Sequence, residues 1–386
     1  MKGLSRSILS FKQSGIRKMF NMTYGMKDII SFAIGEPDFS APARAVLAAN
    51  KCNDSGFTKY TPNAGLLSLR EKIADSLQEY GIKANPEREI IVTVGGMESL
   101  YMIMLVLLNP EDEVIVTDPY WCNYCQQVSM VGGVPVCVPV YEKDGFAFDP
   151  GNVRKAVTDK TKMILINSPA NPTGGVTDLP VLKELAKIAV EHDLYVLTDE
   201  VYKSFLYDGR THHSIAALPG MKERTLLVDS LSKTYAMTGW RVGYTAGPEE
   251  IIAKMVIAQE GLCSSVNSSA QLGAIAALES PPGELEELLA LFDRRRRLIV
   301  DGFNSIKNIS CRMPAGAFYA FPNISATGMS SEDFAVSLLK KEGVVLIPGS
   351  AFGDAGEGFL RLSYATSDEN IMRGVEKVER FVRDST

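Results

Sequence analysis

The chain has 386 residues, 46% of them hydrophobic and 22% charged, a composition typical of a globular protein with one large domain and a smaller one. Its formal net charge of −6 provides no broad positive surface for nucleic acid or acidic membranes. The expected partners are therefore small molecules and other copies of the chain.

The N-terminal segment carries early positive charge, but Ile8, Leu9 and Phe11 are too few and too interrupted to form the apolar part of a signal peptide. The most apolar run, residues 102–108, is too short to span a bilayer. Both features predict a soluble, cytoplasmic protein with no role at a membrane.

Cys122 and Cys125 form a C-x-x-C pair, the spacing of some redox and zinc sites. Such a site usually has a second pair of ligands or nearby histidines, and the chain contains only His192, His212 and His213. We expect two ordinary, partly buried thiols and no bound metal.

Short apolar runs rich in β-branched residues recur along the first two thirds of the chain and are typical of strands buried on both faces. Between many of them lie helical patterns, for example over residues 179–192. This alternation predicts an α/β fold with a largely parallel sheet. The predicted strands are residues 89–94, 113–117, 134–140, 163–167, 194–199, 225–229 and 242–246.

The pattern changes at residues 279–283, a cluster of helix-breaking residues that precedes a long charged helix over residues 284–301. We place a domain boundary there. Residues 294–297 of that helix are four consecutive arginines. Acidic residues lie nearby, so we expect a solvated, salt-bridged face and no anion site.

Polar side chains follow several predicted strands, where open α/β sheets place their ligands. Asp199 and Tyr202 end one strand, Asn171 lies in a turn after another, and Lys233 lies in a serine-rich turn after a third. Earlier, Gly95 and Gly96 separate a strand from a helix, an arrangement suited to binding phosphate at a helix N-terminus.

Eight such segments, taken in order, resemble the class I and II aminotransferases, which are fold-type I pyridoxal phosphate enzymes. The resemblance runs from about residue 30 to 382, and its segments are residues 32–39, 60–65, 118–121, 171–174, 199–202, 230–233, 237–243 and Arg361. It implies a large cofactor-binding domain, residues 45–283, with a mostly parallel seven-stranded sheet between helices. It also implies a smaller α+β domain built from residues 1–44 and 284–386.

The resemblance implies that Lys233 holds pyridoxal 5′-phosphate as a Schiff base and later moves a proton between the substrate and the cofactor. It assigns Asp199 to the protonated pyridine nitrogen, and Tyr202 and Asn171 to the phenolic oxygen. Trp121 matches the ring that stacks on the pyridine. Lys233, Asp199 and Tyr202 are the implied catalytic residues.

A second set of matching positions concerns the phosphate and the substrate. Tyr60 matches a tyrosine that reaches the phosphate of a neighbouring subunit, which implies a homodimer with shared sites. Arg361 matches the arginine that binds the substrate α-carboxylate, since its planar fork fits a carboxylate. Gly35, Trp121 and Asn171 would complete the substrate site. The remaining phosphate-binding positions are Gly95, Gly96, Met97, Ser230, Ser232 and Arg241.

Three functions are compatible with this scaffold: a ping-pong aminotransferase, a carbon–sulfur β-lyase and a sensor domain fused to a DNA-binding module. About 30 residues precede the first matching segment, too few for such a module, and transamination is favoured over the lyase. Residues 14–20 resemble the branch that acts on aromatic amino acids, alanine, aspartate or diaminopimelate-pathway intermediates. No second basic residue is evident in residues 261–267, and Met97 is not basic either. We therefore expect a broad or aromatic-preferring donor range, with 2-oxoglutarate as acceptor.

Overall fold

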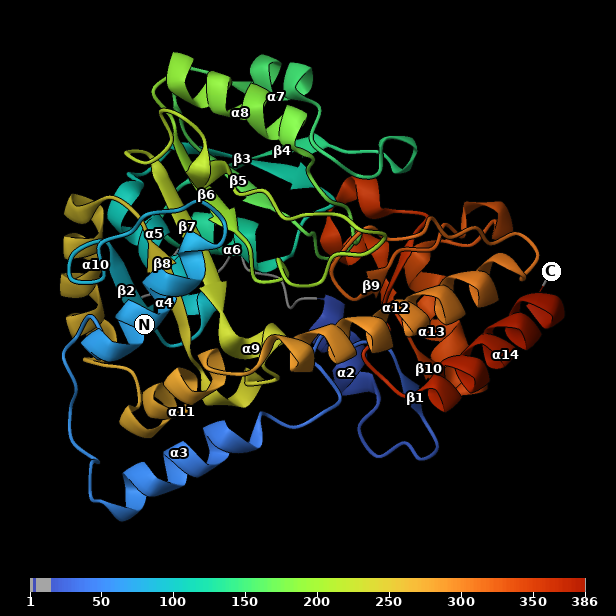
Figure 1. Ribbon diagram of the computed structural model, residues 1–386. Coiled ribbons are helices and arrows are strands. Elements are labelled where there is room, and N and C mark those ends of the chain that lie inside the picture. The colour runs from blue at the N-terminus through green and yellow to red at the C-terminus, as the bar shows by residue number, and fades with distance from the viewer. Residues whose placement is uncertain (1–2, 5–14, 386) are drawn as a thin grey trace.

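The computed structural model describes residues 3–4 and 15–385, and its centre is a seven-stranded sheet (Figure 1). The strand order is β2-β8-β7-β6-β5-β3-β4, in which β8 is antiparallel to both neighbours and all other pairs are parallel. All the predicted strands and the predicted α/β class are confirmed. The strands are β2 Ile90–Thr93, β3 Glu113–Asp118, β4 Val134–Pro139, β5 Thr161–Asn167, β6 Tyr195–Asp199, β7 Thr225–Ser230 and β8 Gly243–Ala246.

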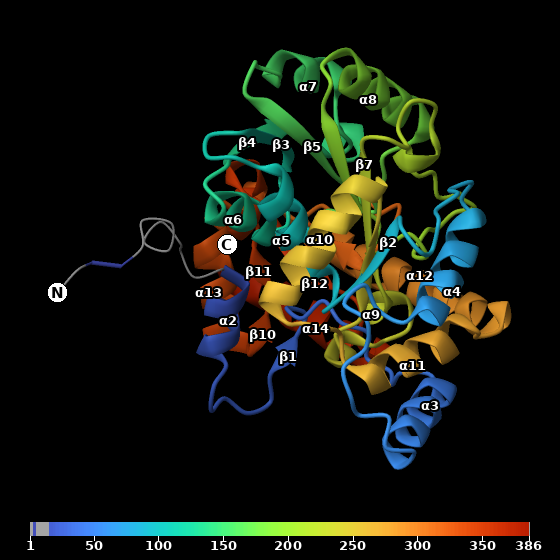
Figure 2. The same cartoon turned by 90° about the vertical axis from the view of Figure 1, so that its left-hand side faces the viewer.

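Helices cover both faces of this sheet because successive strand residues point to opposite sides and both sides are apolar. Val114 packs with α5, α6 and α10 on one face, whereas Ile115 packs with α7 and α8 on the other (Figure 2). Val92 packs with α3, α4 and α11. The helices are α3 Ala43–Asp54, α4 Leu67–Gln78, α5 Gly96–Leu107, α6 Asn123–Met130, α7 Pro150–Ala156, α8 Leu179–Glu191, α9 Leu231–Thr234, α10 Glu249–Leu262 and α11 Ser268–Leu278.

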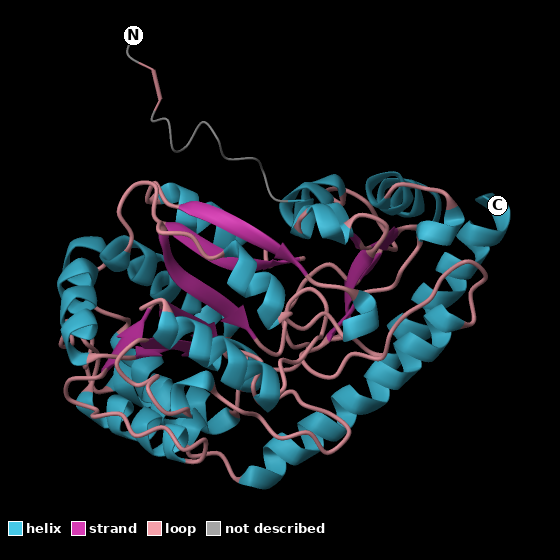
Figure 3. Cartoon of the chain, turned by 90° about the horizontal axis from the view of Figure 1, so that it is seen from above, coloured by secondary structure: helices cyan, strands magenta, loops and turns pink. Residues whose placement is uncertain are grey.

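A second packing unit contains two small sheets and has a separate core (Figure 3). Strand β1 (Ile30–Ser31) pairs in parallel with β10 (Val344–Val345), so both ends of the chain contribute to this unit. The antiparallel sheet β11-β12-β9 contains Ile347–Pro348, Leu360–Ser363 and Tyr319–Ala320. Its helices are α2 Gly15–Met22, α12 Pro282–Asn304, α13 Ser331–Glu342 and α14 Asp368–Ser385.

The carboxyl ends of three parallel strands lie at one edge of the large sheet. Strand β5 ends at Asn167, β6 ends at Asp199 and β7 ends at Ser230. Asn167 and Asp199 are direct partners in the strand register. Parallel pairing therefore brings together three polar residues that are far apart in the sequence.

The arginine run on α12 is salt-bridged as expected, but the prediction that it forms a solvated face is wrong for two of its members. Arg295 and Arg296 are buried. Arg296 forms hydrogen-bonded ion pairs with Asp208 and Asp293 and donates to the Pro314 carbonyl at 2.7 Å. Its guanidinium carbon lies 4.4 Å from the Tyr207 ring centroid. This arginine connects α12 to two loops, an arrangement that the local sequence does not indicate.

Replacing Arg296 with leucine is expected to lower the free energy of unfolding by about 2–3 kcal/mol. The change leaves the Pro314 carbonyl without its donor, whereas Asp208 and Asp293 are partly exposed and can be hydrated. Denaturant unfolding would measure the loss. Arg294→Leu is the matched control, because Arg294 is 64% exposed in its side chain and should change stability by less than about 1 kcal/mol. Equal effects of the two changes on the free energy of unfolding would contradict the role of buried Arg296 in stabilising the fold.

Candidate active site

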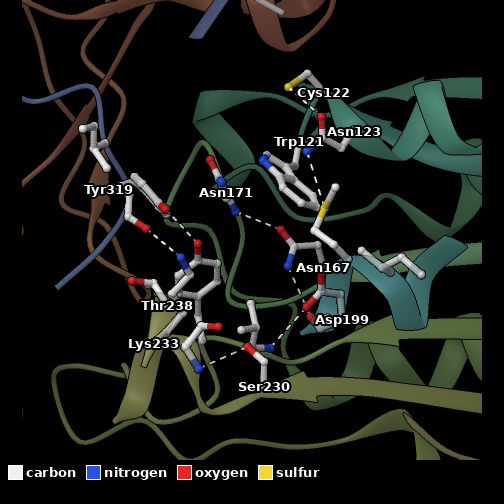
Figure 4. A pocket seen from close by; sticks show the side chains of 18 of the residues that line it. Trp121, Cys122, Asn123, Asn167, Asn171, Asp199, Ser230, Lys233, Thr238 and Tyr319 are labelled. Carbon is white, nitrogen blue, oxygen red and sulfur yellow. Dashed lines mark hydrogen bonds between the residues drawn. The ribbon is translucent and has the colours of Figure 1, made fainter. Parts of the chain in front are cut away.

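A cavity of about 610 Å³ lies at the carboxyl edge of the large sheet, where the second packing unit faces it. That volume is in the range of sites for small molecules and cofactors. Side chains from different elements converge on it, among them Asn171, Asp199, Lys233 and Tyr319 (Figure 4). All the predicted site residues except Gly95 and Tyr60 line this cavity.

One end of the cavity is suited to an anion. Helix α5 begins at Gly96 after Gly95, whose φ of 73° is in the left-handed region that favours glycine. A Cβ at Gly95 would also collide with the Arg241 guanidinium. Arg241 is held by bonds from Nη1 to the Thr238 carbonyl (2.8 Å) and from Nη2 to the Val94 carbonyl (3.4 Å). This end of the cavity is therefore lined by the N-terminus of α5, the Arg241 guanidinium and the buried Ser230.

Asp199 is a buried carboxylate with neutral partners. The Tyr124 hydroxyl donates to its Oδ2 at 2.7 Å, and the Val201 amide donates to its Oδ1 at 3.2 Å. Burial raises the pKa of Asp199 to about 6, although both hydrogen bonds act in the opposite direction. None of the salt bridges in the described part of the chain involves this carboxylate. A cationic group of a ligand placed beside Asp199 would favour its charged form.

The Lys233 amine lies inside the cavity and donates to the Gly35 carbonyl at 2.6 Å. Burial is the main cause that lowers the pKa of Lys233 to about 8; the nearby Arg361 and Arg241 contribute to this shift, while Glu36 and Asp199 oppose it. More of this amine is therefore unprotonated near neutral pH than for a lysine in water, as a nucleophile requires.

Arg361, on β12, is buried at the floor of the cavity. It donates to Asn171 Oδ1 at 3.3 Å and to the Ala33 carbonyl, and its guanidinium lies over the Tyr319 ring at 4.9 Å. Its Nε has no hydrogen-bond partner, and no acidic side chain pairs with it, among the described residues. A buried guanidinium without a carboxylate partner is suited to a carboxylate ligand.

Sequence reasoning missed Tyr319 and Tyr124. The Tyr202 and Tyr319 hydroxyls lie 2.7 Å apart, and a Cβ at Gly35 would collide with the Tyr319 hydroxyl. Tyr124 holds Asp199, and its ring packs edge-on against Trp121 with centroids 5.2 Å apart. The three-residue spacing from Trp121 could have indicated Tyr124, whereas no local signal indicates Tyr319, which approaches from the other packing unit.

Two predicted positions lie outside the lining of the cavity. Gly95 is one residue before it and supports the turn beside Arg241. Tyr60 is 87% exposed and does not line the cavity of its own chain.

A family model described as aminotransferase class I and II matches residues 27–378. The chain belongs to the class I and II aminotransferase family. An aspartate aminotransferase of Pyrococcus abyssi is 43% identical, with 96% of each chain covered. The aromatic-amino-acid aminotransferase 2 of Thermococcus litoralis is 41% identical, covering 99% of this chain and 98% of the relative. The structure of an aspartate aminotransferase from Thermus thermophilus with maleate is 38% identical, covers 98% and 100% of the two chains, and has a TM-score of 0.93.

The protein is therefore an aminotransferase that uses pyridoxal phosphate, as the resemblance implied. Its named relatives are aminotransferases, so the β-lyase alternative is not favoured. The cavity fits the cofactor in chemical terms: an anion site at α5 suits the phosphate, buried Asp199 suits a pyridine nitrogen, and Lys233 suits the aldehyde.

Within residues 3–4 and 15–385, no group of three acidic, histidine or cysteine side chains could hold a metal ion. None of the helices described is both long and apolar enough to cross a bilayer. Cys122 and Cys125 are free thiols; Cys125 is partly buried as expected, whereas Cys122 is buried.

The depressed pKa of Lys233 predicts how the aminotransferase depends on pH when it takes up its cofactor. A lowered pKa means that the amine is mainly unprotonated above about pH 8. The rate at which cofactor-free protein captures pyridoxal phosphate covalently should therefore rise with pH around a midpoint near 8. Stopped-flow absorbance can measure this rate. A midpoint near the ordinary lysine value of 10.5 would contradict the prediction.

Proposed function

We propose that this aminotransferase moves the amino group of a broad range of L-amino acids, with aromatic donors preferred, to 2-oxoglutarate by a ping-pong mechanism. The observation that carries the donor preference is the set of large apolar side chains in the lining of the cavity. These side chains are Phe20, Ile34, Met97, Leu100 and Trp121. Burial of an aromatic substrate side chain against these apolar residues would favour binding. The names of the relatives are divided between aspartate and aromatic amino acids and do not decide which donor is preferred.

In this proposal Arg361 binds the substrate α-carboxylate in a bidentate manner. Asn171 is positioned to assist Arg361 in binding this carboxylate, because its side-chain oxygen already accepts a hydrogen bond from Arg361. The main chain at Gly35 would close one side of the substrate site, and Trp121 would cover the cofactor face. Each of these groups lines the cavity.

When bound, pyridoxal phosphate supplies an electron sink for the charge that develops at the substrate α-carbon. We assign to Lys233 the covalent attachment and, once its amine is released, the movement of the α-proton. Asp199 would hold a proton on the pyridine nitrogen, since its carboxylate is buried and none of the salt bridges among the described residues involves it. Tyr202 would donate to the phenolic oxygen while Tyr319 orients its hydroxyl.

The phosphate would be held by main-chain amides at Gly96 and Met97, by the Ser230 and Ser232 hydroxyls and by Arg241. Both serines are buried, and Ser230 caps the helix that carries Lys233. Amides at a helix N-terminus and a guanidinium together satisfy several phosphate oxygens.

We further propose a cytoplasmic homodimer in which Tyr60 reaches the phosphate of the partner subunit. Tyr60 is 87% exposed, and other exposed apolar residues such as Leu47 (67%) and Ile257 (62%) lie on the same large unit. Burial of such side chains by a second copy would be favourable.

We also propose two domains: a large domain of residues 45–283 and a smaller domain of residues 1–44 and 284–386. Helix α12 begins at Pro282, close to this boundary.

Spectra of the purified holoenzyme would test the substrate proposal. Phenylalanine, tyrosine, alanine and aspartate are added singly, and an accepted donor should bleach the absorption of the covalently held cofactor. Addition of 2-oxoglutarate should then restore it. Exclusive bleaching by aspartate would refute the donor range, and failure of 2-oxoglutarate to restore the band would refute the acceptor.

A further inference from the structure

A fourth cationic side chain, Arg17, lines the cavity in addition to Lys233, Arg241 and Arg361. The proposed function gives a task to each of the other three: attachment, phosphate binding and α-carboxylate binding. Arg17 has no such task. It lies on α2, within residues 14–20, and precedes the first of the eight matching segments.

The position of Arg17 follows from how α2 packs. Met19 is buried in the core of the second packing unit, and α2 lies against β11 and the short helix Gly349–Phe352. Arg17 and Phe20 are three positions apart and therefore share a helix face. Both are exposed and both line the cavity. The Arg17 guanidinium carbon lies 5.6 Å from the Phe20 ring centroid.

The cavity thus has a floor and a mouth of different character. The floor contains the buried side chains of Arg361, Asp199 and Tyr319. The mouth contains Arg17 together with Phe20 and Ile34, which are 45% and 44% exposed. In the proposed function, a substrate that has its α-carboxylate at Arg361 and its amino group at Lys233 would place its side chain in the remaining part of the cavity, toward this mouth. There it meets apolar surface and one guanidinium.

We propose that Arg17 binds the side-chain carboxylate of dicarboxylic substrates, so that one site accepts both these and aromatic substrates. The inference rests on the proposed function, because a ping-pong cycle passes an aromatic donor and a dicarboxylic acceptor through the same pocket. The planar guanidinium offers paired donors to a carboxylate, while the adjacent Phe20 ring offers apolar contact. A basic residue on α2 would supply the second positive charge that residues 261–267 and Met97 lack.

The test compares two unreactive ligands that share one carboxylate and differ at the other end, succinate and 3-phenylpropanoate. Their dissociation constants for the holoenzyme are measured by calorimetry. Arg17→Gln is expected to weaken succinate binding about tenfold, the loss of a charge-assisted hydrogen bond, and to leave 3-phenylpropanoate within about twofold. Arg17→Lys should retain part of the succinate affinity. The ratio of kcat/KM for 2-oxoglutarate to that for phenylpyruvate should fall in parallel in Arg17→Gln.

Lys18→Gln is the matched control on the same helix. Lys18 is exposed, pairs with Glu332 and does not line the cavity, so both dissociation constants should stay unchanged. Equal weakening of both ligands in Arg17→Gln would overturn the proposal, because it would indicate a general effect on α2. Unchanged succinate binding would also overturn it and place the recognition elsewhere, for example on a partner subunit. If the wild type accepts no aromatic donor but Arg17→Gln loses succinate selectively, the donor range fails and the assignment of Arg17 stands.

Discussion

Replacing Lys233 with alanine is expected to lower the turnover number by at least about 10⁴-fold, because both the covalent attachment and the proton transfer depend on one amine. The absorption band of the covalently held cofactor should disappear as well. Lys233 is the only lysine that lines the cavity in the described part of the chain, so no other lysine there can take its place. Absorbance spectra and single-turnover kinetics would measure the two effects.

Two controls distinguish the loss of the nucleophilic amine from the loss of the positive charge. Lys233→Arg keeps a cation in the cavity, but a guanidinium stays protonated and cannot act as the nucleophile, so this variant should be as inactive as the alanine variant. Added ethylamine should partly rescue Lys233→Ala by supplying a free amine. A cofactor band that persists unchanged in Lys233→Ala would show that the attachment site lies elsewhere.

Replacing Asp199 with asparagine is expected to lower the turnover number on the order of 10³-fold, comparable to the loss of one preorganised electrostatic group. The amide has nearly the same shape and can still accept the hydrogen bond from Tyr124. It cannot, however, provide the negative charge that holds a proton on the pyridine nitrogen. Steady-state kinetics at saturating cofactor would measure the loss, with cofactor affinity determined in parallel.

Tyr124→Phe is the comparison for Asp199→Asn. It removes the hydroxyl that donates to the Asp199 carboxylate at 2.7 Å but leaves the charge in place. We expect a loss of about tenfold or less, since one hydrogen bond to a charged group is removed. If Asp199→Asn also kept its turnover within about tenfold of wild type, the carboxylate would not have the proposed role.

The fold was predictable because its determinants are local. Continuous apolar, β-branched runs such as residues 163–167 predict strands buried on both faces, and the interposed helical patterns predict parallel connections. The structure has those strands within one or two residues of the predicted ends. The antiparallel direction of β8 was not predicted, because apolar content does not encode strand direction.

The candidate site was predictable only in part. Asn171, Asp199 and Lys233 lie at or shortly after strand ends, in segments that resemble motifs of the family. Tyr319 and Arg17 approach from the second packing unit, and no local pattern connects them to those segments. Arg296 differs from the predicted solvated arginine for the same reason, since its burial depends on Asp208 and Pro314.

The sequence by itself therefore determined the α/β fold class, because strand periodicity is a property of neighbouring residues. Through its resemblance to the class I and II aminotransferases it also indicated the family and half of the residues that line the cavity. Tertiary structure alone decided that Tyr319 meets Tyr202, that Arg361 is buried without an acidic partner among the described residues, and that Arg17 faces the mouth of the cavity. These features depend on packing between segments far apart in the chain. Burial and pKa are set by that packing, as the Lys233 pKa of about 8 illustrates.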